Sequence, residues 1–371
     1  MSRKIAIIIP VFILMGAVIF YLRSTVEAPT AVLNEVDPIK TLIQSMTLEE
    51  KVSQMFLAGI YSEDSAYVLK QLIIDKKIGS VILMGPTIKN RDVAEVVDDL
   101  QDAARSTNQP PLLISIDQEG GTVSRIKDPG SELTSQPEIH DSIQAYKVAL
   151  TRGSELKRKG VNVNFSPVLE NITEPSSFLY SRVFRGTTEN IASYGESMVR
   201  GYQDAGIAAT IKHFPGHEDS SVDSHKNLPV STVDKNGIYK HTRIFKEVID
   251  KGNPLLVMTA HVLFPEIDKT YPATLSPELI GILRDDYQFD GVIITDDMNM
   301  GAITKMFGVE TAAVQAVRAG NDILLYVADT TVINRARDAV ISAISSQDIS
   351  EGRIDESVYR ILKLKGKLAS E

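Results

Sequence analysis

Three of the six histidines of this 371-residue chain lie within fourteen residues, in the segment KHFPGHEDSSVDSH from Lys212 to His225. Asp223 precedes His225 by two residues. A carboxylate so close to an imidazole can accept a hydrogen bond from it, orient the ring and raise its pKa. A histidine held in this way can donate a proton to a leaving oxygen and later remove one from water. The spacing therefore predicts an acid–base pair.

A metal site is the competing explanation for this cluster of histidines. His213 and His217 are four residues apart, which is the spacing of a zinc-binding pair on a helix. The intervening Phe-Pro-Gly disfavours a helix, and the ammonium of Lys212 would repel a dication beside His213. The chain has no cysteine, which excludes thiolate ligands. We therefore expect no metal and no other cofactor, with His217 bracing the turn.

Other ionisable residues stand at the ends of short apolar runs. Asp117 and Asp296 each close such a run, as do His261 and the adjacent pair Lys212 and His213. In an α/β barrel the catalytic residues come from the carboxyl ends of the strands. We therefore expect these side chains to share one rim, where a carboxylate at a rigid strand end is well placed to act as a nucleophile.

The apolar runs belong to an alternating pattern of strand and helix signals. Eight runs of aliphatic and β-branched residues, typical of parallel strands buried on both faces, span 55–60, 80–84, 112–117, 161–168, 208–214, 255–262, 291–296 and 322–327. Segments of helical periodicity separate most of them. The alternation predicts a (β/α)8 TIM-type barrel in a single catalytic domain, with a doubly wound open sheet as the alternative. No G-x-G-x-x-G follows the first run, which disfavours a dinucleotide-binding fold.

Several motifs, in the same order from about residue 38 to residue 371, resemble those of the β-N-acetylglucosaminidase branch of glycoside hydrolase family 3. The most specific are DQEGGTVSR, SRVFRG, KHFPGHEDSSVDSH, VMTAHVLFPEID and FDGVIITDDMNM. The resemblance implies that Asp296 is the nucleophile, His225 the acid/base and Asp223 its partner. It also implies that the N-acetylglucosamine ring is held by Asp117, Arg125, Arg182, Lys212 and His213.

Three residues depart from the family pattern, one of them Arg185, which stands as an extra residue before the glycine of SRVFRG. Glu218 replaces the glycine that usually follows KHFPGH, and Glu170 replaces the aspartate that is common at the end of NFSPVL. None of the three departures falls on the implied nucleophile or acid/base. We expect no counterpart of the second domain found in longer members of the family, so an acid/base residue from that domain is not expected either. The expected acid/base function therefore depends on His225.

The resemblance implies a retaining exo-β-N-acetylglucosaminidase. Such an enzyme would remove terminal non-reducing N-acetylglucosamine from peptidoglycan fragments or related glycans through a covalent glycosyl-enzyme intermediate. A β-glucosidase is one alternative, which the DSH segment disfavours. A glycoside phosphorylase is another, because a histidine acid/base carries no negative charge to repel phosphate. The third is an inactive membrane-tethered glycan-binding relative, which the presence of Asp296, Asp223 and His225 disfavours.

The amino-terminal region predicts a membrane anchor. A basic start precedes residues 5–22, an uncharged apolar run of 18 residues. This length is near the lower limit for a membrane-spanning helix and exceeds the usual core of a signal peptide. We expect residues 1–4 in the cytoplasm, a stalk over 23–37, and the catalytic domain, 38–371, outside the bacterial cell membrane. The alternative is a cleaved signal peptide and a secreted or periplasmic enzyme.

The overall charge bears on the partners of the chain. Its formal net charge is −9 and it has no basic stripe, which disfavours a nucleic-acid partner. We expect a monomer whose partners are a glycan carrying N-acetylglucosamine and, through residues 5–22, the lipid bilayer.

The anchor can be tested by fractionation. Full-length protein should sediment with membranes and require detergent for extraction, because an apolar helix of this length strongly prefers lipid to water. A chain that starts near Pro38 should stay in the supernatant and serves as the control. Recovery of the full-length product in a soluble extracytoplasmic fraction, with its mature amino terminus at Pro29, would instead identify a cleaved signal peptide.

Overall fold

The computed structural model describes residues 37–217 and 222–370. The chain divides into two compact units, Met1–Thr41 and Leu42–Glu371. The predicted anchor at residues 5–22 and Glu218 lie outside the described residues. Among the helices of the described ranges, none is both long enough and apolar enough to cross a membrane.

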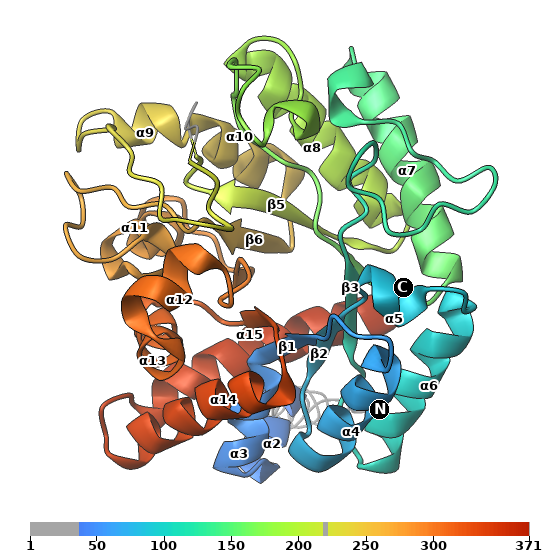
Figure 1. Cartoon of the computed structure of the whole chain (residues 1–371), viewed down its shortest axis with the longest axis vertical. Coiled ribbons are helices and arrows are strands. Elements are labelled where there is room, and N and C mark those ends of the chain that lie inside the picture. Colours follow the sequence, from blue (N-terminus) through green and yellow to red (C-terminus); the bar gives the residue numbers. More distant parts are fainter. Residues whose placement is uncertain (1–36, 218–221, 371) are drawn as a thin grey trace, which may run out of the picture. The chain divides into compact units, whose positions relative to one another are not determined.

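Eight parallel strands form the centre of the larger unit (Figure 1). They are β1 (Phe56–Gly59), β2 (Ser80–Ile82), β3 (Leu113–Ile116), β4 (Val163–Asn164), β5 (Ala208–Phe214), β6 (Leu256–Thr259), β7 (Val292–Thr295) and β8 (Leu324–Val327). From β1 to β7 each strand pairs with the next, and β1 also pairs with β8. A parallel bridge between Ile294 and Ile323 links β7 to the segment that enters β8. The sheet is therefore a nearly closed barrel.

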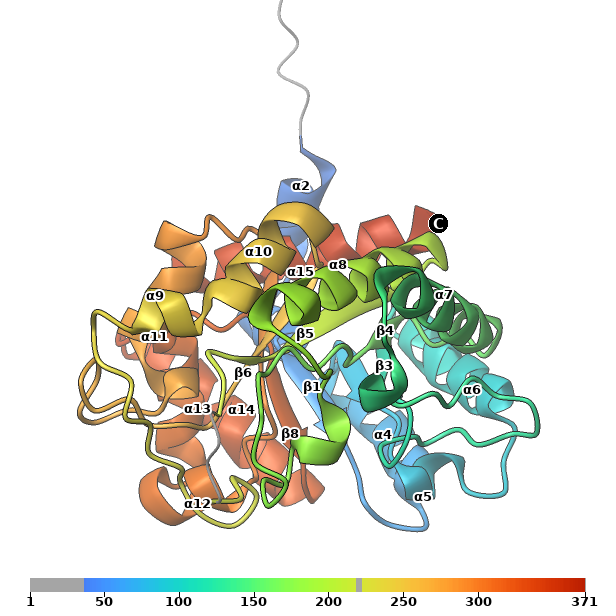
Figure 2. The same cartoon turned by 90° about the horizontal axis from the view of Figure 1, so that it is seen from above.

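Helices alternate with these strands (Figures 1 and 2). They are α2 (Pro38–Ser45), α3 (Leu48–Gln54), α4 (Ser65–Lys76), α5 (Gly85–Ile88), α6 (Val93–Ser106), α7 (Ser142–Arg158), α8 (Thr188–Asp204), α9 (Ile238–His241), α10 (Arg243–Gly252), α11 (Pro277–Gly281), α12 (Gly301–Phe307), α13 (Val309–Ala319), α14 (Thr330–Ser345) and α15 (Glu351–Ser370). The helices from α3 onward lie around the barrel (Figures 1 and 2), and α2 spans the boundary between the two units. The order of elements confirms the predicted TIM-type (β/α)8 pattern.

Burial explains why the sequence pattern predicted this arrangement. All residues of β1 to β7 are buried, because helices cover a parallel barrel from outside and side chains fill it from inside. Helix α10 buries only one stripe, which contains Ile244, Phe245, Val248 and Ile249. Continuous apolar runs therefore mark the strands, and a helical period of apolar residues marks the outer layer.

The fourth strand is shorter than its apolar run predicted. The run 161–168 predicted a strand throughout, but β4 contains only Val163 and Asn164. Pro167 has no N–H with which to extend a ladder. The chain leaves the barrel there in a long connection to α8, and residue Val168 keeps only an isolated bridge to Lys212. This connection supplies several walls of the site described below.

The carboxyl ends of the strands carry the predicted site residues. Asp117 follows β3 directly, and Asp296 follows β7 directly. Lys212 and His213 lie in β5, close to its carboxyl end. Strands that run parallel around a barrel all end at the same rim. The barrel therefore brings together residues that are far apart in the sequence.

Candidate active site

All eight predicted site residues line one cavity of about 420 Å³. They are Asp117, Arg125, Arg182, Lys212, His213, Asp223, His225 and Asp296. Apolar side chains complete the wall, among them Met84, Phe165, Phe178 and Met300. A concave site with convergent charged groups and an apolar lining is typical of the binding site of a small ligand.

Asp296 is ionised in this cavity. The backbone N–H of Asp297 donates to its Oδ1 over 2.7 Å. Burial by itself would raise the pKa of Asp296, but the nearby His213 and His261, the N–H of Asp297 and the ammonium of Lys212 together lower it to about 2. A carboxylate at the rigid end of β7 that keeps its charge at neutral pH can act as a nucleophile.

A network of buried charges lies beside Asp296. The Nζ of Lys212 is 2.9 Å from Oδ1 of Asp117 and 2.6 Å from Oε1 of Glu119, and the lysine side chain is 2% exposed. Arg182 forms two hydrogen bonds to the same glutamate, of 2.8 and 2.9 Å. The guanidinium of Arg125 lies 3.4 Å from Asp117. Three cations thus surround two carboxylates at one rim. The cations offer hydrogen-bond donors and the carboxylates offer acceptors, and a site that binds sugar hydroxyls needs both.

Glu119 was not among the residues that the sequence analysis assigned to the site. Its burial opposes ionisation, but Arg182 and Lys212 hold the pKa of the Glu119 carboxyl well below its usual range. The negative charge of Glu119 holds both cations in place. Its position in DQEGG, two residues after Asp117, was the signal available in the sequence.

Asp223 and His225 form the predicted pair. The Nδ1 of His225 is 2.8 Å from Oδ1 of Asp223, and the backbone N–H of His225 donates to the same oxygen over 3.0 Å. Burial opposes the ionisation of Asp223, yet the two hydrogen bonds from His225 lower its pKa. The imidazole side chain is 60% exposed. Because Asp223 engages Nδ1, the other ring nitrogen, Nε2, is left to exchange protons.

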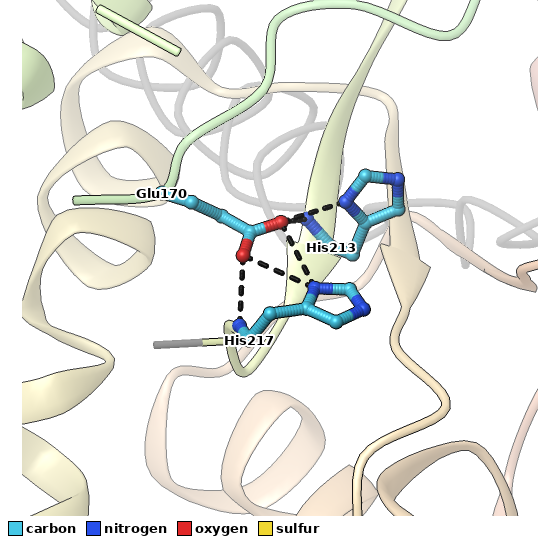
Figure 3. A group of neighbouring side chains, drawn as sticks. All are labelled: Glu170, His213 and His217. Carbon is cyan, nitrogen blue, oxygen red and sulfur yellow. Dashed lines mark hydrogen bonds and ion pairs between the residues drawn. The ribbon is translucent and has the colours of Figure 1, made fainter. Parts of the chain in front are cut away.

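Glu170 connects the other two histidines of the motif (Figure 3). Its carboxylate lies 2.7 Å from Nδ1 of His213 and 3.1 Å from Nδ1 of His217. The backbone N–H groups of the same two histidines donate to it over 3.3 and 2.7 Å. Burial opposes ionisation, but the two histidines hold the pKa of Glu170 well below its usual range. His217 therefore braces the turn, as expected from the sequence.

The same cluster has the composition of a metal site. One ligand atom from each of Glu170, His213 and His217 lies within 4.8 Å of the others. However, four N–H donors already point at the carboxylate, two of them from the backbone. Both Nδ1 atoms use their protons for these bonds, whereas a metal ligand must present a lone pair. Hydrogen bonding accounts for the geometry without an ion.

His213 presents its free ring nitrogen away from Glu170 (Figure 3). Burial lowers the pKa of His213, although the carboxylate of Glu170 acts in the opposite direction. A neutral ring with its proton on Nδ1 leaves Nε2 as an acceptor for a hydroxyl. This geometry is compatible with the predicted contact between His213 and the sugar.

Two further rim residues support Asp296. His261 is fully buried, and its Nε2 lies 3.0 Å from the backbone oxygen of Asp297. Burial raises the pKa of Asp297 to about 7, although the backbone N–H groups of Val327 and Asn299 donate to its carboxylate. A carboxyl that stays partly protonated near neutral pH repels the neighbouring charge of Asp296 less than a second full charge would.

The model for the glycosyl hydrolase family 3 N-terminal domain matches residues 47–364. The chain belongs to glycoside hydrolase family 3. The resemblance found in the sequence motifs is therefore confirmed.

Two relatives of the chain carry the name beta-hexosaminidase. Beta-hexosaminidase A of Pseudoalteromonas piscicida is 32% identical over 329 residues, which cover 81% of this chain and 55% of that protein. Beta-hexosaminidase LpqI of Mycobacterium tuberculosis is 26% identical over 328 residues, covering 85% of this chain and 82% of that protein. The chain thus spans little more than half of the first of these relatives and most of the second.

Solved structures of the family agree with the barrel. A glycoside hydrolase family 3 beta-N-acetylglucosaminidase from a Paenibacillus strain is 39% identical, with a TM-score of 0.82 over 88% of this chain and 63% of that one. A Beta-N-acetylhexosaminidase from Beutenbergia cavernae is 28% identical, with a TM-score of 0.78 over 86% of this chain and 99% of that one. These likenesses support the family assignment by an independent criterion.

The Glu170 cluster leads to a prediction about metal. Any turnover of a chromogenic glycoside by the chain should be unchanged after exhaustive chelation and dialysis, because the hydrogen bonds among Glu170, His213 and His217 need no ion. Elemental analysis should then find less than one equivalent of transition metal. Loss of activity on chelation, with recovery when zinc is added, would show that the cluster is a metal site after all.

Proposed function

We propose that this chain is a retaining exo-β-N-acetylglucosaminidase that acts on terminal non-reducing N-acetylglucosamine. The observation that carries the proposal is that an ionised Asp296 and the hydrogen-bonded pair Asp223 and His225 line the same cavity. Nucleophile and acid/base are the two groups that retaining glycoside hydrolysis requires. The names of the relatives, beta-hexosaminidase and beta-N-acetylglucosaminidase, support this choice of sugar.

The first step forms the glycosyl-enzyme. A carboxylate oxygen of Asp296 attacks the anomeric carbon while the bond from that carbon to the leaving oxygen breaks. His225 gives its Nε2 proton to the leaving oxygen, so the aglycone departs as a neutral alcohol. Asp223 stabilises the imidazolium before transfer and keeps Nδ1 protonated throughout.

The second step releases the sugar. Neutral His225 removes a proton from water, whose oxygen attacks the anomeric carbon, and the bond to Asp296 breaks to return the free carboxylate. Two inversions at the same carbon retain its configuration. Both charge states of the starting enzyme, ionised Asp296 and protonated His225, are then restored.

The buried charge network holds the donor sugar. Lys212, Arg125 and Arg182 supply N–H donors, while Asp117 and the Nε2 of His213 accept from hydroxyl groups. Because each cation is already fixed by a carboxylate, little side-chain entropy is lost when the sugar binds. The resemblance and the position of all five residues on the cavity wall support these contacts.

The natural substrate is proposed as a peptidoglycan fragment or a related glycan. A β-glucosidase would instead turn over an aryl glucoside faster than the matching N-acetylglucosaminide, so the two are compared side by side. A phosphorylase would give a sugar phosphate when phosphate is present. A glycan-binding relative without activity would turn over neither glycoside.

The location outside the cytoplasmic membrane is also a proposal. The apolar run at residues 5–22, preceded by a basic start, supports a single-pass anchor, a stalk over 23–37 and a monomeric catalytic domain over 38–371. A gel-filtration mass near that of one chain, for protein starting at Pro38, would support the monomer.

Two substitutions should fail in different ways. Asp296→Ala removes the nucleophile, so turnover should fall to near background with every leaving group. His225→Ala should lose about 10²–10⁴-fold on an unactivated glycoside, which needs a proton on its leaving oxygen. With an activated aryl glycoside the His225→Ala enzyme should release one equivalent of aglycone in a burst and then turn over slowly. Stopped-flow absorbance measures both phases.

Added azide separates the two steps further. Azide attacks the anomeric carbon without needing a base, so it should speed the slow phase of His225→Ala and give the β-glycosyl azide. Asp290→Ala removes an exposed carboxylate at the opposite end of β7 and is the control that should keep wild-type rates. Substantial activity of Asp296→Ala would rule out the retaining mechanism, and wild-type behaviour of His225→Ala would place the acid/base elsewhere.

A further inference from the structure

The segment that follows the nucleophile contacts the segment that carries the acid/base. Helix α12 begins at Gly301, five residues after Asp296. The backbone N–H of Gly301 donates to the oxygen of His225 over 3.1 Å, and that of Ala302 donates to the oxygen of Ser224 over 3.3 Å. The start of α12 is therefore bonded to the backbone of the proposed acid/base residue itself.

Gly301 permits this contact because it has no side chain. A Cβ atom at this position would lie 2.6 Å from the backbone oxygen of Lys226 and 2.9 Å from that of His225. Real Cβ contacts are essentially never so short, and backbone atoms cannot turn aside as a flexible side chain can. The close approach of two backbones is a recurrent reason for glycine. Any larger residue must move one segment away from the other.

The same helix makes a second attachment. The Nζ of Lys305 donates to the backbone oxygen of Lys226 over 2.6 Å and to Oδ1 of Asn227 over 3.2 Å. Four successive residues, 224–227, thus accept hydrogen bonds from α12. Lys305 is exposed, so a substitution there can remove its bonds without creating a clash.

An aromatic side chain holds the acid/base ring from another direction. Phe178 lies edge-on to His225, with ring centroids 6.1 Å apart, and edge-on to His217 at 5.5 Å. It packs against a separate apolar cluster formed by Val168, Ile172, Leu179 and Val183. The ring of His225 is thus placed by Phe178 and Asp223, while its backbone is placed by α12.

The link from nucleophile to helix is short and well bonded. The N–H of Asp297 donates to the carboxylate of Asp296, and the N–H of Met300 donates to the backbone oxygen of Asp297 over 2.9 Å. The N–H of Met298 donates to the backbone oxygen of Leu325, in β8, over 2.9 Å. Because this turn is fixed to the barrel, the position of Gly301 follows that of Asp296.

We propose that Gly301 is a positioning residue for the proposed reaction, which docks the acid/base segment on the helix that follows the nucleophile and so sets the separation of His225 and Asp296. The inference rests on the proposed function. A carboxylate and a proton donor must act on the same anomeric centre, and a misplacement of about 1 Å can cost about 10²-fold in rate. The hydrogen bonds between α12 and the segment of His225 couple the positions of the two groups.

The test compares Gly301→Ala with wild type on two glycosides. On an unactivated N-acetylglucosaminide, kcat should fall by about 10²-fold, with a smaller change in KM because the sugar-binding residues lie on other strands. On an activated aryl glycoside the variant should show a burst of aglycone followed by a slow phase that azide accelerates. This pattern reports loss of acid/base action, which a general loss of folded enzyme would not reproduce.

Matched variants control for structural damage. Gly366→Ala adds a methyl group within α15, where nothing lies within 4 Å of the new atom, and should behave as wild type. Lys305→Met should give the same burst and azide response as Gly301→Ala, to a smaller extent, and keeps the test open if Gly301→Ala does not fold. Adding Gly301→Ala to His225→Ala should slow the unactivated substrate little further, because both changes remove one action.

The outcomes separate this inference from the proposed function. Wild-type kinetics for both Gly301→Ala and Lys305→Met would overturn the inference, as would an equal loss on both glycosides with no burst and no response to azide. If His225→Ala itself showed neither a burst nor an azide response, the role of His225 in the proposed function would be the part that is wrong.

Discussion

The rest of the site depends on the ion pairs that the ammonium of Lys212 forms with two carboxylates. The ammonium is buried at the end of β5 and bonded to Asp117 and Glu119, which reach it from the end of β3. Taking one partner away would leave a charge uncompensated in a place from which water is largely excluded, and breaking such a pair costs about 3–5 kcal/mol. The barrel must therefore bring β3 and β5 to the same rim with their charges matched. Arg182 joins the network through Glu119 and orders the long connection after β4.

The charges around Lys212 also determine which groups carry protons. Asp296 keeps its negative charge because His213, His261, the N–H of Asp297 and the ammonium of Lys212 together outweigh the effect of burial, whereas burial allows Asp297 to hold a proton near neutral pH. Burial lowers the pKa of His213 and favours its neutral form, against the opposing effect of the Glu170 carboxylate. His225, by contrast, is exposed and hydrogen-bonded to the carboxylate of Asp223, as its proposed role requires. The four histidines near the cavity thus have different environments and different proposed roles. His213 binds the sugar and His217 braces the turn. His261 supports Asp296, and His225 transfers protons.

The sequence predicted the barrel and the polar ends of its strands because both depend on local patterns. Continuous apolar runs marked the strands, and single ionisable residues marked where Asp117, Lys212 and Asp296 would emerge. The outline of β4 was missed because the run 161–168 gives no local sign of where the ladder stops, apart from Pro167. Glu119 and Gly301 were missed for another reason. Each matters through a contact with a residue distant in the sequence, to Arg182 and His225 respectively. The DQEGG motif places Glu119 near Asp117, but a local pattern does not specify its distant partner.

Covalent trapping of the glycosyl-enzyme tests the central claim most directly. A fluorinated N-acetylglucosaminide with an activated leaving group should form the intermediate quickly and release it slowly, so that intact-mass measurement finds one added sugar per chain. Fragmentation of the labelled peptide should place the sugar on Asp296, within VIITDDMNM. A label on another carboxylate, on Asp297 in particular, or steady turnover of ordinary substrate with no trapped species, would contradict the account.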